Sequence, residues 1–268
     1  MIIYIAGGAG NYVKDIKFKI PCLDSYFYLT NKKIERAFEH SEYFFLDSGA
    51  FSAFTKDKKI DIDKYIEFIK KYKDKLTVYS VLDDITDYEK TEENQKYMES
   101  KGLAPNPCYH YGEPIKVLEQ MIENYDYISI GGMVPISTKE LHPFLNNCFD
   151  IICDEEGKPK VKVHGFGMTI INLMKQYPWY SVDSTTAIIT AAMGGMINKK
   201  GKTINIGRNK IISTSIKQYI KDNYNYSFDQ VRDDYKIRIL MNINYFLNLS
   251  KELTENPPRY INKQNKLF

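Results

Sequence analysis

Three aspartates of this chain, Asp47, Asp83 and Asp183, each follow a run of apolar residues, where a buried strand would end. Two carboxylates can act on the anomeric carbon of a sugar, one as general acid and the other as nucleophile. The nucleophile then forms a covalent glycosyl intermediate that a second acceptor releases. Alternatively, each aspartate caps the turn or helix that follows it. Asp84 adjoins Asp83, so the sequence leaves open which of the two faces a site.

Glycine and histidine residues occupy similar positions at the ends of other apolar runs. Gly131 and Gly132 follow residues 127–130, and their unobstructed N–H groups suit either a planar ligand or a tight turn. His110 and His164 lie near the ends of two further runs, where a histidine serves either in catalysis or as a satisfied polar residue. The two histidines and several acids could also hold a metal, but their spacing fits no known ligand signature, so we expect none.

A basic segment lies between residues 199 and 210 and contains no acidic residue. Its members are Lys199, Lys200, Lys202, Arg208 and Lys210. Such a cluster either contacts phosphates or forms a solvated loop. The formal net charge of +3 is too small to imply nucleic-acid binding by itself. Beside the aspartates, the cluster would favour a polyanionic substrate.

The apolar runs alternate with segments of helical spacing along the chain. We expect strands at residues 2–6, 43–47, 77–82, 107–111, 127–131, 161–165, 179–182 and 203–206, and irregular structure over 11–30. We expect helices over residues 31–40, 60–73, 91–102, 114–124, 169–176, 184–196 and 228–249, and a helix with a loop over 137–158. This alternation indicates β/α units and a parallel sheet.

About eight β/α units in about 250 residues match a (β/α)8 barrel. An open doubly wound sheet is the alternative, but no Gly-rich dinucleotide fingerprint follows the first strand. In a barrel the carboxyl ends of all strands converge on one face, which would bring the aspartates, glycines and histidines together.

The chain has 268 residues, of which 43% are hydrophobic, and this supports one large domain. We expect a barrel over residues 1–250 that ends in a helical segment, followed by a polar tail over 251–268. Four cysteines without disulfide or zinc spacing are typical of reduced thiols in an intracellular protein. The N-terminus shows no basic leader and no run reaches about 20 apolar residues, so we expect a cytoplasmic protein without membrane association.

Five segments, in order, resemble the motifs of tRNA-guanine transglycosylases (queuine tRNA-ribosyltransferases). Asp47-Ser48-Gly49-Ala50-Phe51 is similar to their Asp-Ser-Gly-Gly-Phe segment, and Leu82-Asp83-Asp84 to their Phe-Asp-Glu segment. Ile130-Gly131-Gly132-Met133 resembles their Gly-Gly-Leu loop. Val163-His164-Gly165-Phe166-Gly167 resembles the Met-Gly-Val-Gly strand, and Ser181-Val182-Asp183-Ser184 the strand of the nucleophilic aspartate.

The resemblance implies a (β/α)8 barrel that exchanges guanine for a 7-deazaguanine such as preQ0 or preQ1 without a cofactor. It implies that Asp183 attacks the sugar C1′ and that Asp47 reads the base and shuttles its proton. Asp83 would hydrogen-bond the amidine edge of the base. Gly131 and Gly132 would bind the base oxygen through their N–H groups. The remaining substrate-binding residues expected from the matched segments are Met133, Ser48 and His164.

This chain departs from the family pattern in two places. His110-Tyr111-Gly112-Glu113 stands where the family has Val-Gln-Gly-Gly, so either His110 or Tyr111 would replace the glutamine. The Cys-x-Cys-x-x-Cys and histidine zinc site of the tRNA enzymes has no counterpart, and the chain is shorter than those enzymes. It thereby resembles the compact 7-deazaguanine DNA transglycosylases.

We therefore expect DNA rather than tRNA as the substrate, with the target base flipped out or single-stranded. A nucleoside or base glycosidase and a non-catalytic nucleic-acid-binding subunit are the rival functions. The resemblance also allows a homodimer, although no interface signature is present.

Overall fold

The computed structural model describes residues 1–12, 19–207 and 212–261. Its central feature is a curled sheet of eight parallel strands in the order β4-β3-β2-β1-β8-β7-β6-β5. The strands are β1 (Ile2–Ala6), β2 (Ile20–Ser25), β3 (Ser41–Asp47), β4 (Val78–Tyr79), β5 (Cys108–His110), β6 (Tyr127–Gly131), β7 (Lys162–Gly165) and β8 (Ser181–Ser184). This order, with helices between the strands, confirms the expected (β/α)8 barrel.

The edge strands β4 and β5 meet through a single parallel bridge between Ser80 and Asn106. The Val81 N–H donates to the Asn106 carbonyl oxygen at 3.0 Å, and the Asn106 N–H donates to the Tyr79 carbonyl oxygen at 2.8 Å. The buried Asn106 side chain also accepts a hydrogen bond from the Ser129 hydroxyl and donates to the Tyr127 carbonyl oxygen. Asn106 therefore ties the barrel together where its ladder is shortest.

Replacing Asn106 with alanine should lower the free energy of unfolding by about 2 to 3 kcal/mol, because the buried Ser129 hydroxyl and the Tyr127 carbonyl oxygen would each lose a hydrogen bond. Urea denaturation measures the change. Asn124→Ala is the control, since this exposed asparagine only bonds the Gln120 carbonyl oxygen of its own helix. Equal stability of the two variants would contradict the role assigned to Asn106.

Two of the expected assignments are wrong, although the expected number of barrel strands, eight, agrees with the structure. Residues 11–30, expected to be irregular, contain the barrel strand β2. The segment did not resemble a strand because its second residue is Pro21, which lacks a backbone N–H. Residues 203–206, expected to be the eighth barrel strand, instead contribute β10 (Thr203–Asn205), which pairs antiparallel with β9 (Gly195–Ile197) in a separate sheet. Short apolar runs do not reveal which strand they pair with.

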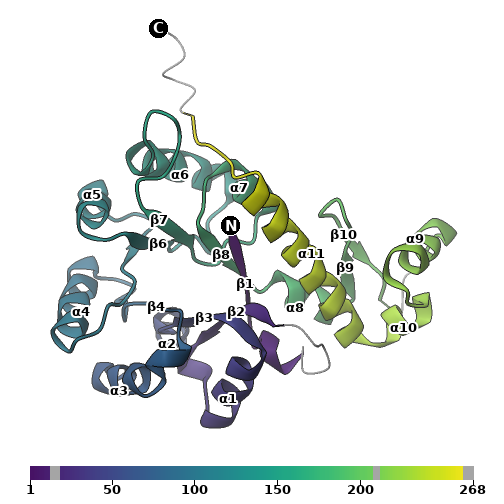
Figure 1. The fold of residues 1–268 in the computed structure, drawn as a ribbon, viewed down its shortest axis with the longest axis horizontal. Coiled ribbons are helices and arrows are strands. Elements are labelled where there is room, and N and C mark those ends of the chain that lie inside the picture. The colour runs from purple at the N-terminus through teal and green to yellow at the C-terminus, as the bar shows by residue number, and fades with distance from the viewer. Residues whose placement is uncertain (13–18, 208–211, 262–268) are drawn as a thin grey trace, which may run out of the picture.

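Most expected helices are present, with small changes at their ends. They are α1 (Asn31–His40), α3 (Ile62–Tyr72), α4 (Tyr88–Ser100), α5 (Ile115–Asn124), α6 (Thr138–Ile152), α7 (Ile171–Gln176) and α8 (Thr186–Ala192). The structure adds α2 (Ala50–Phe54) and α9 (Thr214–Tyr224), and it divides the helix expected over 228–249 into α10 (Phe228–Asp233) and α11 (Tyr235–Glu255). Figure 1 shows α1, α3, α4, α5 and α6 around the outside of the strands.

A smaller apolar cluster lies beside the barrel. Its buried members are Met196, Ile206, Ile220, Val231 and Met241. In Figure 1, α11 lies between the barrel strands and the group formed by β9, β10, α9 and α10. The buried Arg238 of α11 anchors this group by donating to the carbonyl oxygens of Ala191, Val231 and Arg232.

Within the described part of the chain, none of the helices combines the length and apolar character that crossing a bilayer requires.

Aromatic rings fill the interior of the barrel. The Phe45 ring lies 5.6 Å from the Tyr4 ring, 4.5 Å from the His164 ring and 5.4 Å from the Phe166 ring, measured between centroids. Tyr4, Phe45 and His164 are almost completely buried. These side chains close the interior of the barrel, so a ligand binds on the side of the carboxyl ends of the strands.

Candidate functional site

A cavity of about 940 Å³ opens at the carboxyl ends of the barrel strands. Four aspartates from four strand ends line it: Asp24, Asp47, Asp83 and Asp183. His110, Tyr111, Gly131 and Gly132 also line it. The structure thus brings together the three aspartates, one histidine and the two glycines that the sequence singled out. A cavity of this volume accommodates a nucleotide-sized ligand.

Asp183 is the third residue of β8 and is 6% exposed. Its Oδ1 accepts a hydrogen bond of 2.7 Å from the Gly167 N–H. The His164 Nε2 lies 3.4 Å from the same oxygen. The Gly167 hydrogen bond and the neighbouring His164 ring both lie on the side of Oδ1, which leaves Oδ2 as the oxygen available for chemistry.

His164 lies beneath Asp183 in the barrel interior. Its Nδ1 is 2.7 Å from the Ser181 hydroxyl, which is in turn 2.7 Å from the Tyr127 hydroxyl. Burial lowers the pKa of His164, although Asp183 opposes this effect. The ring is therefore neutral at pH 7 and packs beneath the Asp183 carboxylate as an uncharged neighbour.

Asp47 ends β3 and faces the same cavity. Burial raises its pKa to about 7, with further contributions from the charges of Asp83 and Asp183, while the Gly49 N–H has the opposite effect. Near neutral pH both protonation states of Asp47 are populated. This is the property that a group needs in order to donate and accept the same proton.

Asp83, not Asp84, faces the cavity. Burial raises the pKa of Asp83 to about 6, although His110 opposes the shift. Asp84 instead accepts hydrogen bonds from the Thr86 N–H and hydroxyl, which makes it a loop cap. The alternative left open by the sequence is thus resolved in favour of Asp83.

His110 ends β5 and faces Asp83 across the seam of the barrel. The His110 Nε2 lies 3.9 Å from the Asp83 Oδ2, and its Nδ1 lies 2.9 Å from the Glu113 Oε1. Burial lowers the pKa of His110, but the Cys108 sulfur and the Asp83 and Glu113 carboxylates outweigh it and raise the pKa. Tyr111 also lines the cavity, so both of the residues named as alternatives at this position border it.

The two glycines at the end of β6 keep this part of the cavity open. A Cβ at Gly131 would lie 2.9 Å from the Cys108 sulfur and from the His110 ring. Gly132 has φ of +68°, and a Cβ there would lie 2.9 Å from the Tyr111 nitrogen. A side chain at either position would therefore collide with its neighbours.

Three residues expected to bind substrate do not belong to the cavity lining that the described residues form. Ser48 is fully buried, donates its N–H to the Ser80 hydroxyl and accepts the Ala50 N–H, so it shapes the turn after β3. Met133 is 3% exposed and packs in the core. His164 is fully buried and packs beneath Asp183, as described above.

The basic segment is not part of the cavity either. Lys199, Lys200 and Lys202 lie in the turn between β9 and β10, where the Asn198 side chain accepts the N–H groups of Lys200 and Lys202. They contribute nothing to the described cavity lining. Arg208 and Lys210 lie outside the described residues.

Asp24 is a cavity residue that the sequence analysis missed. It lies near the end of β2, and its Oδ1 accepts a 2.8 Å hydrogen bond from the Gly8 N–H. Burial raises its pKa to about 6. A signal was present, because Leu23-Asp24-Ser25 repeats the Leu46-Asp47-Ser48 pattern at the end of β3.

Exposed aromatic side chains line the cavity as well. Tyr28 is 46% exposed, Phe51 54% and Tyr111 37%. The Lys56 ammonium lies 4.6 Å from the centre of the Tyr28 ring and brings positive charge beside it. Flat rings beside a cation suit nucleobases attached to phosphates.

No protein-family model matches the chain, and a search of curated proteins finds no match.

The cavity carboxyl groups predict that the protein becomes less stable as pH rises. The folded pKa values of Asp24, Asp47 and Asp83 all exceed the ordinary value of 3.8. Between about pH 5 and pH 8 the folded protein therefore holds protons that the unfolded chain has released. The free energy of unfolding should fall across this range by on the order of 3 kcal/mol.

Urea unfolding at a series of pH values tests this expectation. His164 has the opposite effect at the acidic end, because its folded pKa is lowered. Asp47→Asn isolates the carboxyl contribution, since it removes the aspartate with the highest pKa of the three. The dependence of unfolding free energy on pH should therefore be weaker in this variant. Parallel profiles for Asp47→Asn and the wild type would contradict the pKa assigned to Asp47.

Proposed function

We propose that this protein exchanges guanine in DNA for a 7-deazaguanine through a covalent aspartyl-sugar intermediate. The observation that carries the proposal is that Asp47, Asp83, Asp183, Gly131 and Gly132 all line one cavity. These residues come from four different strand ends, and their order along the chain is the order of the transglycosylase motifs they resemble.

In this reaction Asp183 is the nucleophile. Its Oδ2 forms a bond to the sugar C1′ while the bond from C1′ to the guanine nitrogen breaks. The Gly167 N–H holds the carboxylate through Oδ1 during this step. The incoming base then attacks C1′ and displaces Asp183. Two inversions leave the configuration of the sugar unchanged, as in other double displacements.

Asp47 transfers the proton that the exchange requires. In its acid form it donates to the departing guanine, and the resulting carboxylate accepts a proton from the incoming base. Its pKa of about 7 keeps both forms available at neutral pH. No net proton is gained or lost in a complete exchange.

Asp83, Gly131 and Gly132 recognise the base. An ionised Asp83 accepts hydrogen bonds from the amidine edge, and the glycine N–H groups bind the base oxygen. Tyr28, Phe51 and Tyr111 provide flat surfaces for the flipped base or its neighbours.

Incorporation of a labelled base tests the proposal. The protein is incubated with guanine-containing single-stranded DNA, duplex DNA or tRNA, together with labelled guanine or a labelled 7-deazaguanine. We expect label in DNA and little in tRNA. Label in tRNA alone would assign the tRNA substrate instead. Release of guanine without an incoming base would indicate a glycosidase, and binding without turnover would indicate a non-catalytic subunit.

A further inference from the structure

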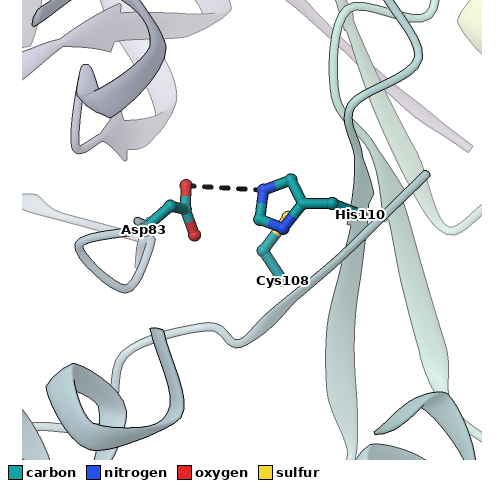
Figure 2. Close-up of side chains that lie close together, drawn as sticks. All are labelled: Asp83, Cys108 and His110. Carbon is teal, nitrogen blue, oxygen red and sulfur yellow. Dashed lines mark ion pairs between the residues drawn. The ribbon is translucent and has the colours of Figure 1, made fainter. Parts of the chain in front are cut away.

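We propose that Asp83, Cys108 and His110 form a binding site for a divalent transition-metal ion of the zinc type, at the seam of the barrel. One potential ligand atom from each residue lies within 4.8 Å of the others. Figure 2 shows the Asp83 carboxylate facing the His110 imidazole, with Cys108 beside the same ring.

The backbone accounts for this convergence. Cys108 and His110 are two residues apart on β5, so their side chains lie on the same face of the strand. Asp83 follows the neighbouring strand β4, which is joined to the segment before β5 by the Ser80–Asn106 bridge. The Asp83 Oδ2 and His110 Nε2 are 3.9 Å apart, whereas nitrogen and oxygen ligands of tetrahedral zinc are about 3.3 Å apart. A small side-chain movement closes this difference.

Glu113 gives His110 the orientation of a metal ligand. Its Oε1 lies 2.9 Å from the His110 Nδ1. A carboxylate at this nitrogen fixes the imidazole so that the other nitrogen can bind a metal, an arrangement common around zinc. The His110 Nε2, the nitrogen that remains, is the one that faces Asp83.

The Asp83 carboxylate also has a buried oxygen that no neighbouring group in the described part of the chain satisfies. The Asp83 side chain is only 10% exposed, and its Oδ1 is buried without a hydrogen-bond partner among the described residues. Burying a carboxylate is unfavourable unless a positive charge compensates it, and a metal ion that displaces the proton of the His110 Nε2 would supply that charge at the same place. Gly131 leaves the adjoining space free, since a Cβ there would contact the Cys108 sulfur and the His110 ring.

The donor set selects the kind of metal. A thiolate, an imidazole and a carboxylate favour zinc or a similar transition metal over magnesium or calcium, which prefer oxygen ligands. Three protein ligands leave a fourth position for water or a substrate atom, as in catalytic rather than structural zinc sites. Asp83 and His110 line the cavity, so the fourth position is accessible from it.

Cobalt titration of the reduced, metal-free full chain tests the site. Bound Co²⁺ should give a thiolate-to-metal charge-transfer band and the intense visible bands of tetrahedral coordination, and Zn²⁺ should abolish both by displacement. We expect about one Co²⁺ per chain. Cys108→Ser should lose the charge-transfer band and bind at least about 100-fold more weakly. Cys148→Ser, which alters a fully buried thiol in α6, should retain the band.

Two further variants keep the proposal testable if Cys108→Ser does not fold. Asp83→Asn should weaken binding while it keeps the band, and Glu113→Gln should weaken it by about 10-fold to 100-fold. Absence of the band in the wild type, or its persistence in folded Cys108→Ser, would overturn the proposal. Because the titration contains no nucleic acid or free base, its failure would leave the proposed base exchange untouched.

Discussion

Base exchange should fall by at least about 10⁴-fold in the Asp183→Asn variant, because a neutral amide cannot attack the sugar C1′. Asparagine has the same shape and can still accept the Gly167 N–H through its Oδ1, so the fold should survive. The measurement is single-turnover incorporation of labelled base. Mass spectrometry of the denatured reaction should show a covalent adduct in the wild type and none in the variant.

Asp84→Asn provides the matched control for this prediction. Asp84 is also a carboxylate at a strand end, but it caps the loop around Thr86 and does not contribute to the described cavity lining. Its variant should exchange bases at close to the wild-type rate. Wild-type exchange by Asp183→Asn would rule out Asp183 as the nucleophile.

Loss of the Asp47 proton-transfer group should slow exchange by about 10²-fold to 10⁴-fold in Asp47→Asn. In the wild type, the rate of guanine departure should decline as pH rises through about 7, because the acid form of Asp47 disappears. Asp47→Asn should lack this decline. The experiment is a pH profile of the single-turnover rate for both proteins.

The same variant should be more stable than the wild type at pH 8, because it removes a buried charge. A combination of greater stability and lower activity would identify Asp47 as a residue retained for chemistry rather than for folding. If Asp47→Asn kept both the rate and the pH dependence of the wild type, the proton transfer would have to be assigned elsewhere. The apparent pKa would belong to the cluster of Asp47 and Asp83 together.

The barrel could be predicted because its apolar strand segments alternate with amphipathic helices such as α3, whose Tyr65, Ile66, Ile69 and Tyr72 are buried at helical spacing. Strand β2 was missed because it contains Pro21, a residue that normally argues against a strand. The run at β10 has the composition of a barrel strand, but only tertiary structure shows that it pairs with β9. Composition identifies a strand more readily than it identifies the partner of that strand.

The site could be predicted where a residue ends a strand, as for Asp47, His110 and Gly131. His164 shows the limit of that reasoning. It pairs with Ser181, two residues before Asp183, and therefore lies one layer lower, inside the barrel. Two of the exposed aromatic residues around the cavity, Tyr28 and Phe51, were given no role, because their positions depend on loops rather than on the strand pattern.

The single bridge between Ser80 and Asn106 has a thermodynamic consequence for ligand binding. Asp83 lies on one side of this junction, whereas Cys108 and His110 lie on the other. Any molecule or ion held by both sides also cross-links the first and second halves of the chain. Its affinity and the resistance of the junction to local opening must therefore rise together, and amide hydrogen exchange at Val81 and Asn106 would report the occupancy of the cavity.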